Sequence, residues 1–409
     1  MKSTLLICGA SAAGTVSAAT IHRTVVATFF GWWLLGAFAV PASAQVGSIT
    51  AGRDHFCALT TAGAVQCWGF NGTGALGDGT TTNRLTPVPV SSLGSGVQAI
   101  TAGAGHTCAL TTAGAVLCWG SNQFGFLGNG TTTNSLTPVP VTGLSSGVQA
   151  IGAGQSHTCA VTTAGAVLCW GYGINGQLGN GSTANRLMPF PVTGLDSGVQ
   201  AVAGGNFHAC ALTTTGAVQC WGTNSSGQLG DGTTVRRLTP VPVTSLSSGV
   251  QAIAVGGLHS CALTTAGAMQ CWGSNVFGQL GDGTTLSRTT PVTVIGLGSG
   301  VQAVAAVDTH TCTVTITGAV QCWGSNSLGE LGDGTTIQRL TPVAVTGLNS
   351  GVQAVAAGRS NTCALTTGGV VLCWGRNDAG QLGDGTQTQR STPVLVLGDW
   401  LQIFRNGFE

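Results

Sequence analysis

Cysteine is the residue whose spacing in this 409-residue chain most directly predicts chemistry, because fourteen of the fifteen cysteines form pairs ten positions apart. The pairs recur every 51 residues, and a tryptophan follows the second cysteine of each pair. They are Cys57 with Cys67, Cys108 with Cys118, Cys159 with Cys169, Cys210 with Cys220, Cys261 with Cys271, Cys312 with Cys322, and Cys363 with Cys373. An even set in one repeated frame predicts structural disulfides, with buried free thiols as the alternative. A metal or redox site is disfavoured, because zinc needs clustered ligands and each pair supplies only two.

The stretch HTCALTTAGAVLCWG (residues 106–120) indicates how the two cysteines of a pair come together. Residues 112–114 (Thr-Ala-Gly) fit a three-residue hairpin turn, in which Gly114 takes the left-handed conformation without steric cost. Counting outward from the turn places Cys108 opposite Cys118. Strand alternation makes this a non-hydrogen-bonded pair with Cα atoms about 4.5 Å apart, which a disulfide can bridge. We therefore predict one hairpin disulfide in each repeat.

Histidine recurs two residues before the first cysteine in six repeats, and asparagine takes the seventh place. The positions are His55, His106, His157, His208, His259, His310 and Asn361. Six histidines distributed over six repeats are too dispersed to converge on one ion. We expect each to be structural and to bond to the backbone, and we predict no metal, no cofactor and no catalytic residue.

A second repeated motif is G-D-G-T-x-x-x-R, in which arginine follows aspartate after six positions. The pairs are Asp78 with Arg84, Asp231 with Arg237, Asp282 with Arg288, Asp333 with Arg339, and Asp384 with Arg390. Asn129 and Asn180 replace the aspartate in two repeats, and Ser135 replaces one arginine. We expect an Asp–Arg ion pair to close each loop. Calcium binding is the alternative, although each loop supplies a single carboxylate and EF-hand spacing is absent.

These positions must be held by strands, because one repeat (residues 97–147) contains four short strand-like runs and no helical periodicity. The prolines of its last run, LTPVPV, favour an edge position, where a missing N–H costs no ladder bond. Four-stranded units of this period must stack on their neighbours to bury both faces, as propeller blades do. Strand-like sequences at residues 46–49 and 400–404 favour a ring closed by shared strands, with an open solenoid as the alternative. We predict an all-β, seven-bladed β-propeller of 51-residue, four-stranded repeats.

The repeated motif GxxHTCALTxxGAVxCWGxNxxGQLGDGT resembles the repeat of the regulator of chromosome condensation family over residues 46–400. The resemblance implies a seven-bladed β-propeller. The chain departs from the familiar eukaryotic pattern in its paired cysteines, and it has neither a basic tail nor any lysine after Lys2. Nucleotide exchange on a nuclear GTPase is therefore not expected. A secreted bacterial type is the nearer analogue, similar in fold to β-lactamase-inhibitor protein II, which binds an enzyme through loops on one face of the ring.

The N-terminus predicts export, which disulfides require. Basic residues precede the apolar run 25–40, and an Ala-Ser-Ala sequence ends at residue 44. We predict a signal peptide over 1–44, a propeller over 45–404 and a C-terminal tail over 405–409, with an uncleaved membrane anchor as the alternative to cleavage. Cleavage would remove Cys8 and leave no membrane span. The expected location is extracellular, periplasmic or in the cell envelope.

Charge excludes one class of partner. Charged residues make up 6% of the chain, against about a quarter in ordinary domains. After residue 44 there are eleven arginines and twelve acidic residues, so the net charge there is near −1. A neutral surface without lysine or a basic patch is unsuited to phosphate backbones, and we expect no nucleic-acid binding.

Function is expected where the repeat is broken. We call the two residues before each histidine position a slot; the seven slots read Arg53-Asp54, Ala104-Gly105, Gln155-Ser156, Asn206-Phe207, Gly257-Leu258, Asp308-Thr309 and Arg359-Ser360. Exposed aromatic and arginine side chains are typical anchors of protein interfaces. The candidate binding residues are Arg53, Asp54, Phe207, Leu258, Asp308 and Arg359, which we expect to form a rim around the central channel, with Phe124 and Tyr172 in the glycine-rich loops as a competing surface.

These features favour a secreted, monomeric, non-enzymatic scaffold that binds a protein or a surface polymer. A glycan-active enzyme of the envelope is one alternative, although the sequence shows no paired carboxylates or nucleophile–base motif. A purely structural envelope protein is the other.

Overall fold

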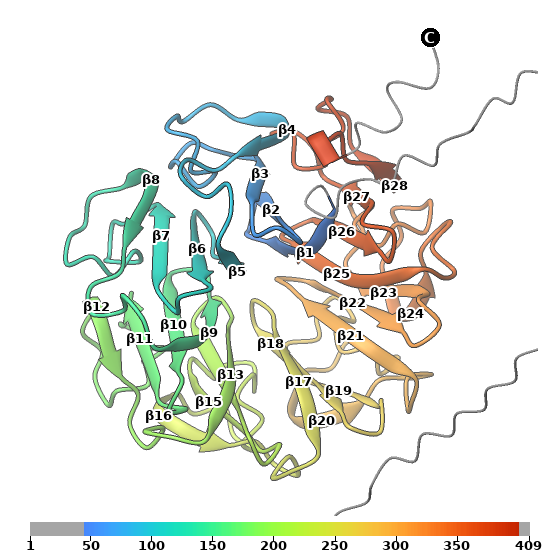
Figure 1. The fold of residues 1–409 in the computed structure, drawn as a ribbon. Coiled ribbons are helices and arrows are strands. Elements are labelled where there is room, and N and C mark those ends of the chain that lie inside the picture. Colours follow the sequence, from blue (N-terminus) through green and yellow to red (C-terminus); the bar gives the residue numbers. More distant parts are fainter. Residues whose placement is uncertain (1–44, 401–409) are drawn as a thin grey trace, which may run out of the picture. The chain divides into compact units, whose positions relative to one another are not determined.

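Seven antiparallel sheets of four strands each form a ring in the computed structural model, which describes residues 45–400 (Figure 1). The predicted all-β, seven-bladed propeller is confirmed. The predicted signal peptide, residues 401–404 and the predicted tail lie outside the described residues.

Each blade consists of four consecutive strands, numbered from the channel outward. The innermost strands are β1 (Val46–Ala51), β5 (Val97–Ala102), β9 (Val148–Ala153), β13 (Val199–Gly204), β17 (Val250–Val255), β21 (Val301–Ala306) and β25 (Val352–Gly358). The second strands are β2 (His55–Thr60), β6 (His106–Thr111), β10 (His157–Thr162), β14 (His208–Thr213), β18 (His259–Thr264), β22 (His310–Thr315) and β26 (Asn361–Thr366). The third strands are β3 (Val65–Gly69), β7 (Val116–Gly120), β11 (Val167–Gly171), β15 (Val218–Gly222), β19 (Met269–Gly273), β23 (Val320–Gly324) and β27 (Val371–Gly375). The outer strands are β4 (Arg84–Pro89), β8 (Ser135–Pro140), β12 (Arg186–Pro191), β16 (Arg237–Pro242), β20 (Arg288–Thr293), β24 (Arg339–Ala344) and β28 (Arg390–Leu395).

The second and third strands form the predicted disulfide hairpin. In blade 2, β6 and β7 place Cys108 opposite Cys118 with Cα atoms 4.1 Å apart and a disulfide between them. Gly114 of the turn has φ 78°, the left-handed value that favours glycine. The proline-containing run lies on the outer edge of each sheet, as predicted.

The other six blades carry the same bridge, so all seven predicted disulfides are confirmed. They join Cys57 to Cys67, Cys159 to Cys169, Cys210 to Cys220, Cys261 to Cys271, Cys312 to Cys322, and Cys363 to Cys373. In each of these blades the two cysteines face each other in the register of the hairpin, as they do in blade 2. The alternative of buried free thiols is therefore wrong for these fourteen cysteines.

Blades pack through a core shared by neighbours. Trp119 of blade 2 is fully buried against the Cys57–Cys67 disulfide of blade 1 and Leu76 of its loop. Its indole Nε1–H donates to the carbonyl of Ala75, also in blade 1, at 2.9 Å. The tryptophan and the disulfide of each repeat therefore serve different interfaces of the same blade, which explains why both recur together.

The ring closes by the same packing, since Trp68 of blade 1 packs in one cluster with the Cys363–Cys373 disulfide of blade 7. Its Nε1–H donates to the carbonyl of Gln381 at 2.9 Å, and the first and last blades lie side by side (Figure 1). Within residues 45–400 the four strands of every blade come from a single repeat. The strand predicted to close the ring by sharing lies, apart from Trp400, outside the described residues. Trp400, expected to open a further strand, lies in a short 3₁₀ turn and packs on Trp68 with ring centroids 6.3 Å apart.

The repeated histidines connect neighbouring blades. His106 Nε2 lies 2.9 Å from the Thr158 hydroxyl of the next blade, and that hydroxyl donates to the carbonyl of Phe126 at 3.1 Å. Because the hydroxyl proton is used there, the histidine donates from Nε2, and burial lowers its pKa to about 3, so the ring is neutral. The predicted backbone partner is wrong, since a threonine or serine hydroxyl in the next blade likewise meets His55, His208, His259 and His310.

Two junctions lack this bond. The threonine position facing His157 is Ala209, and neither ring nitrogen of His157 has a hydrogen-bond partner. At the closure of the ring, Asn361 replaces histidine and Phe56 replaces threonine, so the Asn361 side chain has no partner either. Residues 45–400 contain no helix that is long and apolar enough to cross a membrane.

Candidate functional site

All seven slots lie on one face of the ring. Each slot joins the innermost strand of a blade to the second strand, whose other end carries the hairpin turn. The slots and the hairpin turns therefore occupy opposite faces. We call the first of these the slot face.

Backbone hydrogen bonds attach the glycine-rich loops to the slots. In every blade, the residue after Trp-Gly donates its N–H to the carbonyl of the second slot residue. In blade 3, Tyr172 N donates to Ser156 O at 2.9 Å, and in blade 4, Thr223 N donates to Phe207 O at 2.8 Å. The rim and the loops, predicted as competing surfaces, are thus parts of the same face.

Four rings form a continuous row across blades 2 to 4 of this face. Phe124 lies 5.9 Å from Phe126 and 4.9 Å from Tyr172, and Tyr172 lies 6.3 Å from Phe207, measured between ring centroids. Phe124 is exposed, Tyr172 and Phe207 are half-buried, and Phe126 is buried against His106. We call Phe124, Phe126, Tyr172 and Phe207 the aromatic row. It combines three separately predicted candidates, and it includes Phe126, which was not among them.

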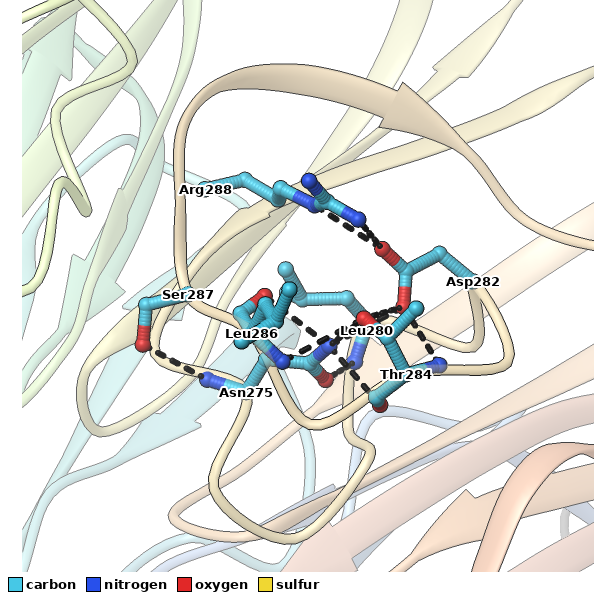
Figure 2. Close-up of polar contacts among 7 residues, drawn as sticks. All are labelled: Asn275, Leu280, Asp282, Thr284, Leu286, Ser287 and Arg288. Atoms are coloured by element: carbon cyan, nitrogen blue, oxygen red, sulfur yellow. Dashed lines mark hydrogen bonds and ion pairs between the residues drawn. The ribbon is translucent and has the colours of Figure 1, made fainter.

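A polar network gives most glycine-rich loops their shape, as Figure 2 shows for blade 5. The Asn275 side chain donates to Asp282 Oδ1 at 3.0 Å and accepts the N–H of Leu280 at 2.9 Å. Arg288 forms an ion pair with Asp282 at 2.8 Å. Partial burial raises the pKa of the Asp282 carboxyl, but hydrogen bonds from Thr284 and Arg288 outweigh this and hold that pKa below its usual value. All five predicted Asp–Arg pairs are present.

Blade 3 has lost this network, because Gly173 takes the asparagine position and Asn180 the aspartate position. Arg186, left without its carboxylate, lies over the ring of Phe190 at 4.1 Å. The loop of blade 3, which carries Tyr172 of the aromatic row, therefore lacks the polar network that holds most of the other loops.

Charged side chains gather on blades 7 and 1 instead. Arg376 bonds to Asp54 at 3.0 Å and to Asp378 in an ion pair of 2.6 Å. Arg53 Nε lies 3.9 Å from a carboxylate oxygen of Asp54. The exposed Arg359 donates its backbone N–H to the carbonyl of Arg53 at 2.9 Å. This charged sector extends across the junction that closes the ring.

The central channel opens among the first slot residues. It contains a cavity of about 280 Å³ whose lining includes Arg53, Gln155, Asn206 and Asp308. Burial raises the pKa of the Asp308 carboxyl, against a hydrogen bond from Asn206 and the charges of Arg53 and Arg359. Of the predicted rim, Arg53 and Asp308 line this cavity.

The other predicted rim residues lie around the opening in separate sectors. Asp54 and Arg359 belong to the charged sector, whereas Phe207 belongs to the aromatic row and Leu258 is half-buried in blade 5. The predicted mixed rim is therefore divided into a charged part and an apolar part. Within residues 45–400, no group of three or more His, Cys, Asp or Glu side chains is placed to hold a metal ion.

A second hollow of about 310 Å³ lies over blade 2, and the sequence alone did not reveal it. It is bounded by Phe70 and Phe126, with Arg53 at the end that it shares with the channel. The signal that could have revealed it is the slot Ala104-Gly105, the only slot made of two small residues.

The chain matches two related protein families. Residues 186–403 match the RCC1-like domain. Residues 62–110 and 113–161, and in a second version residues 47–75, 97–125 and 148–177, match the regulator of chromosome condensation (RCC1) repeat.

Curated relatives cover most of the chain. The ultraviolet-B receptor UVR8 of Arabidopsis thaliana is 34% identical over 355 residues, which are 85% of this chain and 81% of the receptor. The secretion-regulating guanine nucleotide exchange factor of Bos taurus is 33% identical, covering 83% of this chain and 80% of that protein. The human E3 ubiquitin-protein ligase HERC2 is 34% identical over 83% of this chain, which spans only 7% of the ligase.

Two solved structures have the same fold. Human WBSCR16 gives a TM-score of 0.73 at 24% identity, covering 82% of this chain and 94% of that one. Yeast RCC1 (Prp20), in its complex with Kap60, gives a TM-score of 0.73 at 21% identity, with 94% and 92% coverage.

Proposed function

The chain belongs to the regulator of chromosome condensation (RCC1) repeat family, and we propose that it is an exported, non-enzymatic scaffold that binds a protein partner through the slot face. The aromatic row is the centre of the interface. The protein acts as a monomer, outside the cytosol, in the extracellular space, the periplasm or the cell envelope.

The observation that carries the proposal is the aromatic row. Large aromatic side chains dominate the binding energy of protein interfaces, and they do so when they cluster. The row is centred on blade 3, whose loop has Gly173 and Asn180 in place of the repeated polar residues. A repeat that keeps its disulfide and loses its loop network only at this surface is consistent with selection for contact there.

Rigid support for the row favours binding as well. Cys159–Cys169 and Cys210–Cys220 lock the hairpins of blades 3 and 4, and the tether from Tyr172 N to Ser156 O fixes the loop. Association therefore orders few groups of the scaffold, which lowers the entropic cost of binding.

Export is supported by the seven hairpin disulfides, because such bridges form and persist in oxidising compartments and are rare in the cytosol. The names of the relatives describe a receptor, a ligase and an exchange factor, so the family propeller accompanies different activities. None of these activities is carried over, because function resides in sites and not in the fold.

The test is photo-cross-linking from two faces of the oxidised protein. A benzoylphenylalanine in place of Phe124 reports on the slot face, and one in place of Ile316 reports on the opposite face, where that side chain is 71% exposed. We expect one stoichiometric protein partner to cross-link from position 124 and not from position 316.

The captured partner then allows an affinity measurement. The double variant Tyr172→Ser/Phe207→Ser should weaken its binding at least tenfold, about 1.4 kcal/mol, while the matched control Ile316→Ser leaves it unchanged. Equal binding by the double variant, or cross-linking from position 316 alone, would overturn the proposal.

A further inference from the structure

The hollow over blade 2 exists because a slot lacks side chains. The second slot position carries Asp54, Phe207 or Leu258 in three other blades, serine or threonine in the remaining three, and Gly105 in blade 2. Ala104 before it adds only a methyl group. With these side chains missing, a hollow of about 310 Å³ remains open over blade 2.

Its lining combines two aromatic rings with polar groups, among them Ser121, Gln155 and Ser156. Phe70, 37% exposed, and Phe126 face the space from the loops of blades 1 and 2. Thr73, whose hydroxyl donates to the carbonyl of Gly105 at 2.9 Å, and the exposed Gln123 complete the edge. Such a lining fits a group with an apolar body and a polar tip.

The inner end holds one charge of each sign and favours neither a cation nor an anion. Arg53 lies there beside Asp54, whose carboxylate Arg376 already binds at 3.0 Å. The buried Nε of Arg53 has no hydrogen-bond partner. A charged side chain of either sign would meet one like and one opposite charge there, so charge brings it no net advantage. A neutral group that accepts a hydrogen bond or offers an aromatic face to the guanidinium is favoured.

We infer that this hollow, the blade-2 pocket, takes one tyrosine or tryptophan side chain of the partner. The inference rests on the proposed function. The ring lies between Phe70 and Phe126, and its polar tip or its face meets Arg53. Tyrosine and tryptophan alone among neutral side chains combine a large apolar ring with a hydrogen-bonding end. Phe126 belongs both to the pocket wall and to the aromatic row, so the pocket continues the proposed interface.

Small probes test the pocket without the partner. N-acetyl-tyrosinamide, N-acetyl-tryptophanamide, N-acetyl-leucinamide and methyl glucoside are titrated against the oxidised full chain by ligand-observed NMR. We expect saturable binding of the two aromatic amides, at least tenfold tighter than that of the leucine amide and of the glucoside.

The variant Gly105→Leu fills the pocket. Gly105 does not have a positive φ, and Leu258 holds the equivalent place in blade 5. A Cβ at position 105 would lie 3.1 Å from the Thr73 hydroxyl, which must shift by a few tenths of an ångström. The variant should keep its melting temperature and lose aromatic-amide binding at least tenfold. The matched control Thr309→Leu makes a similar change in blade 6 and should bind like the wild type. Phe70→Ser, which removes one wall, should also lose at least fivefold.

Three outcomes would overturn the pocket: no saturable binding of either aromatic amide, unchanged binding in Gly105→Leu, or tighter binding of methyl glucoside than of the amides. Failure of the pocket can be told from failure of the proposed function. A partner that depends on Tyr172 and Phe207 but binds Gly105→Leu normally refutes only the pocket.

Discussion

At the scale of single residues, the buried histidines make the stability of the protein sensitive to acid. Burial, with smaller effects from the charges of His55 and His157, lowers the pKa of His106 to about 3, and burial lowers the pKa of His55 to about 4. His157, His208, His259 and His310 have pKa values lowered to about 3 or 4 in the same way. All six therefore stay neutral in the folded protein at moderate acidity.

Acid should destabilise the propeller well before its carboxylates titrate. The unfolded chain binds protons as the pH falls below the ordinary histidine pKa of 6.5, whereas the folded chain does not until about pH 4. Each histidine thus lowers the unfolding free energy as the pH falls through that window. Urea midpoints should fall steeply between pH 6.5 and pH 4, and His106→Gln should reduce the steepness. A midpoint independent of pH across this range would contradict neutral burial.

His157 offers a stabilising substitution, because it is the histidine that faces Ala209 and lacks a partner. Ala209→Thr should supply the hydroxyl found at other junctions, accept the histidine N–H and donate to the carbonyl of Gln177, which already accepts Trp221 Nε1–H at 2.9 Å. We expect a gain of about 1 kcal/mol in unfolding free energy by urea titration.

The reverse substitution is the control. Thr158→Ala leaves His106 unpaired and should cost about 1–3 kcal/mol. If Ala209→Thr destabilises the protein while Thr158→Ala is neutral, the His–Thr bond does not hold the blades together.

At the scale of elements, local patterns were predictable and contacts between blades were not. The hairpin register followed from one turn glycine and strand alternation, which lie within the 15 residues 106–120. The partner of His106 is Thr158, 52 positions later and in another blade, so no local pattern identifies it. The aromatic row escaped prediction for the same reason, since Phe124, Tyr172 and Phe207 come from three blades. Trp400 was expected to begin a strand, but it lies in a 3₁₀ turn and packs on Trp68, a contact with the first blade that no local pattern identifies.

Each hairpin disulfide should stabilise its blade by a similar amount. A closed loop of about ten residues removes about 2–3 kcal/mol of unfolded-state entropy. We expect Cys108→Ala/Cys118→Ala to lower the unfolding free energy by about this much, with added loss where Cys118 packs near Trp170. Intact-mass analysis should show fourteen fewer hydrogens in the oxidised than in the reduced protein, as seven bridges require. Free thiols titrated in unfolded, unreduced protein would contradict the pairing.

At the scale of the molecule, the residues that differ between repeats are unevenly distributed around the ring. The slot face carries ion pairs around Arg376 and Asp54 on blades 7 and 1, and aromatic rings on blades 2 to 4. A uniform repeat would give seven equivalent sites, so this division sets the orientation in which a partner can bind. The charged sector is also where the chain closes on itself, at one of the two junctions that lack the His–Thr bond.

Closure of the ring should therefore depend on the last described residue. Trp400 is 7% exposed and lies in the cluster that joins Trp68 to blade 7. Replacing a buried tryptophan by alanine costs about 3–5 kcal/mol when the site cannot collapse. Trp400→Ala should lower the urea midpoint and increase proteolysis at the junction of blades 7 and 1, because the loss falls where Asn361 already has no partner. Trp400→Phe keeps a ring against Trp68 and should recover most of the stability.

Deletion of residues 398–409 should match Trp400→Ala and form aggregates through the uncovered blade. A truncated chain that stays monomeric in size-exclusion chromatography with an unchanged midpoint would show that the packing of blades 1 and 7 suffices without Trp400.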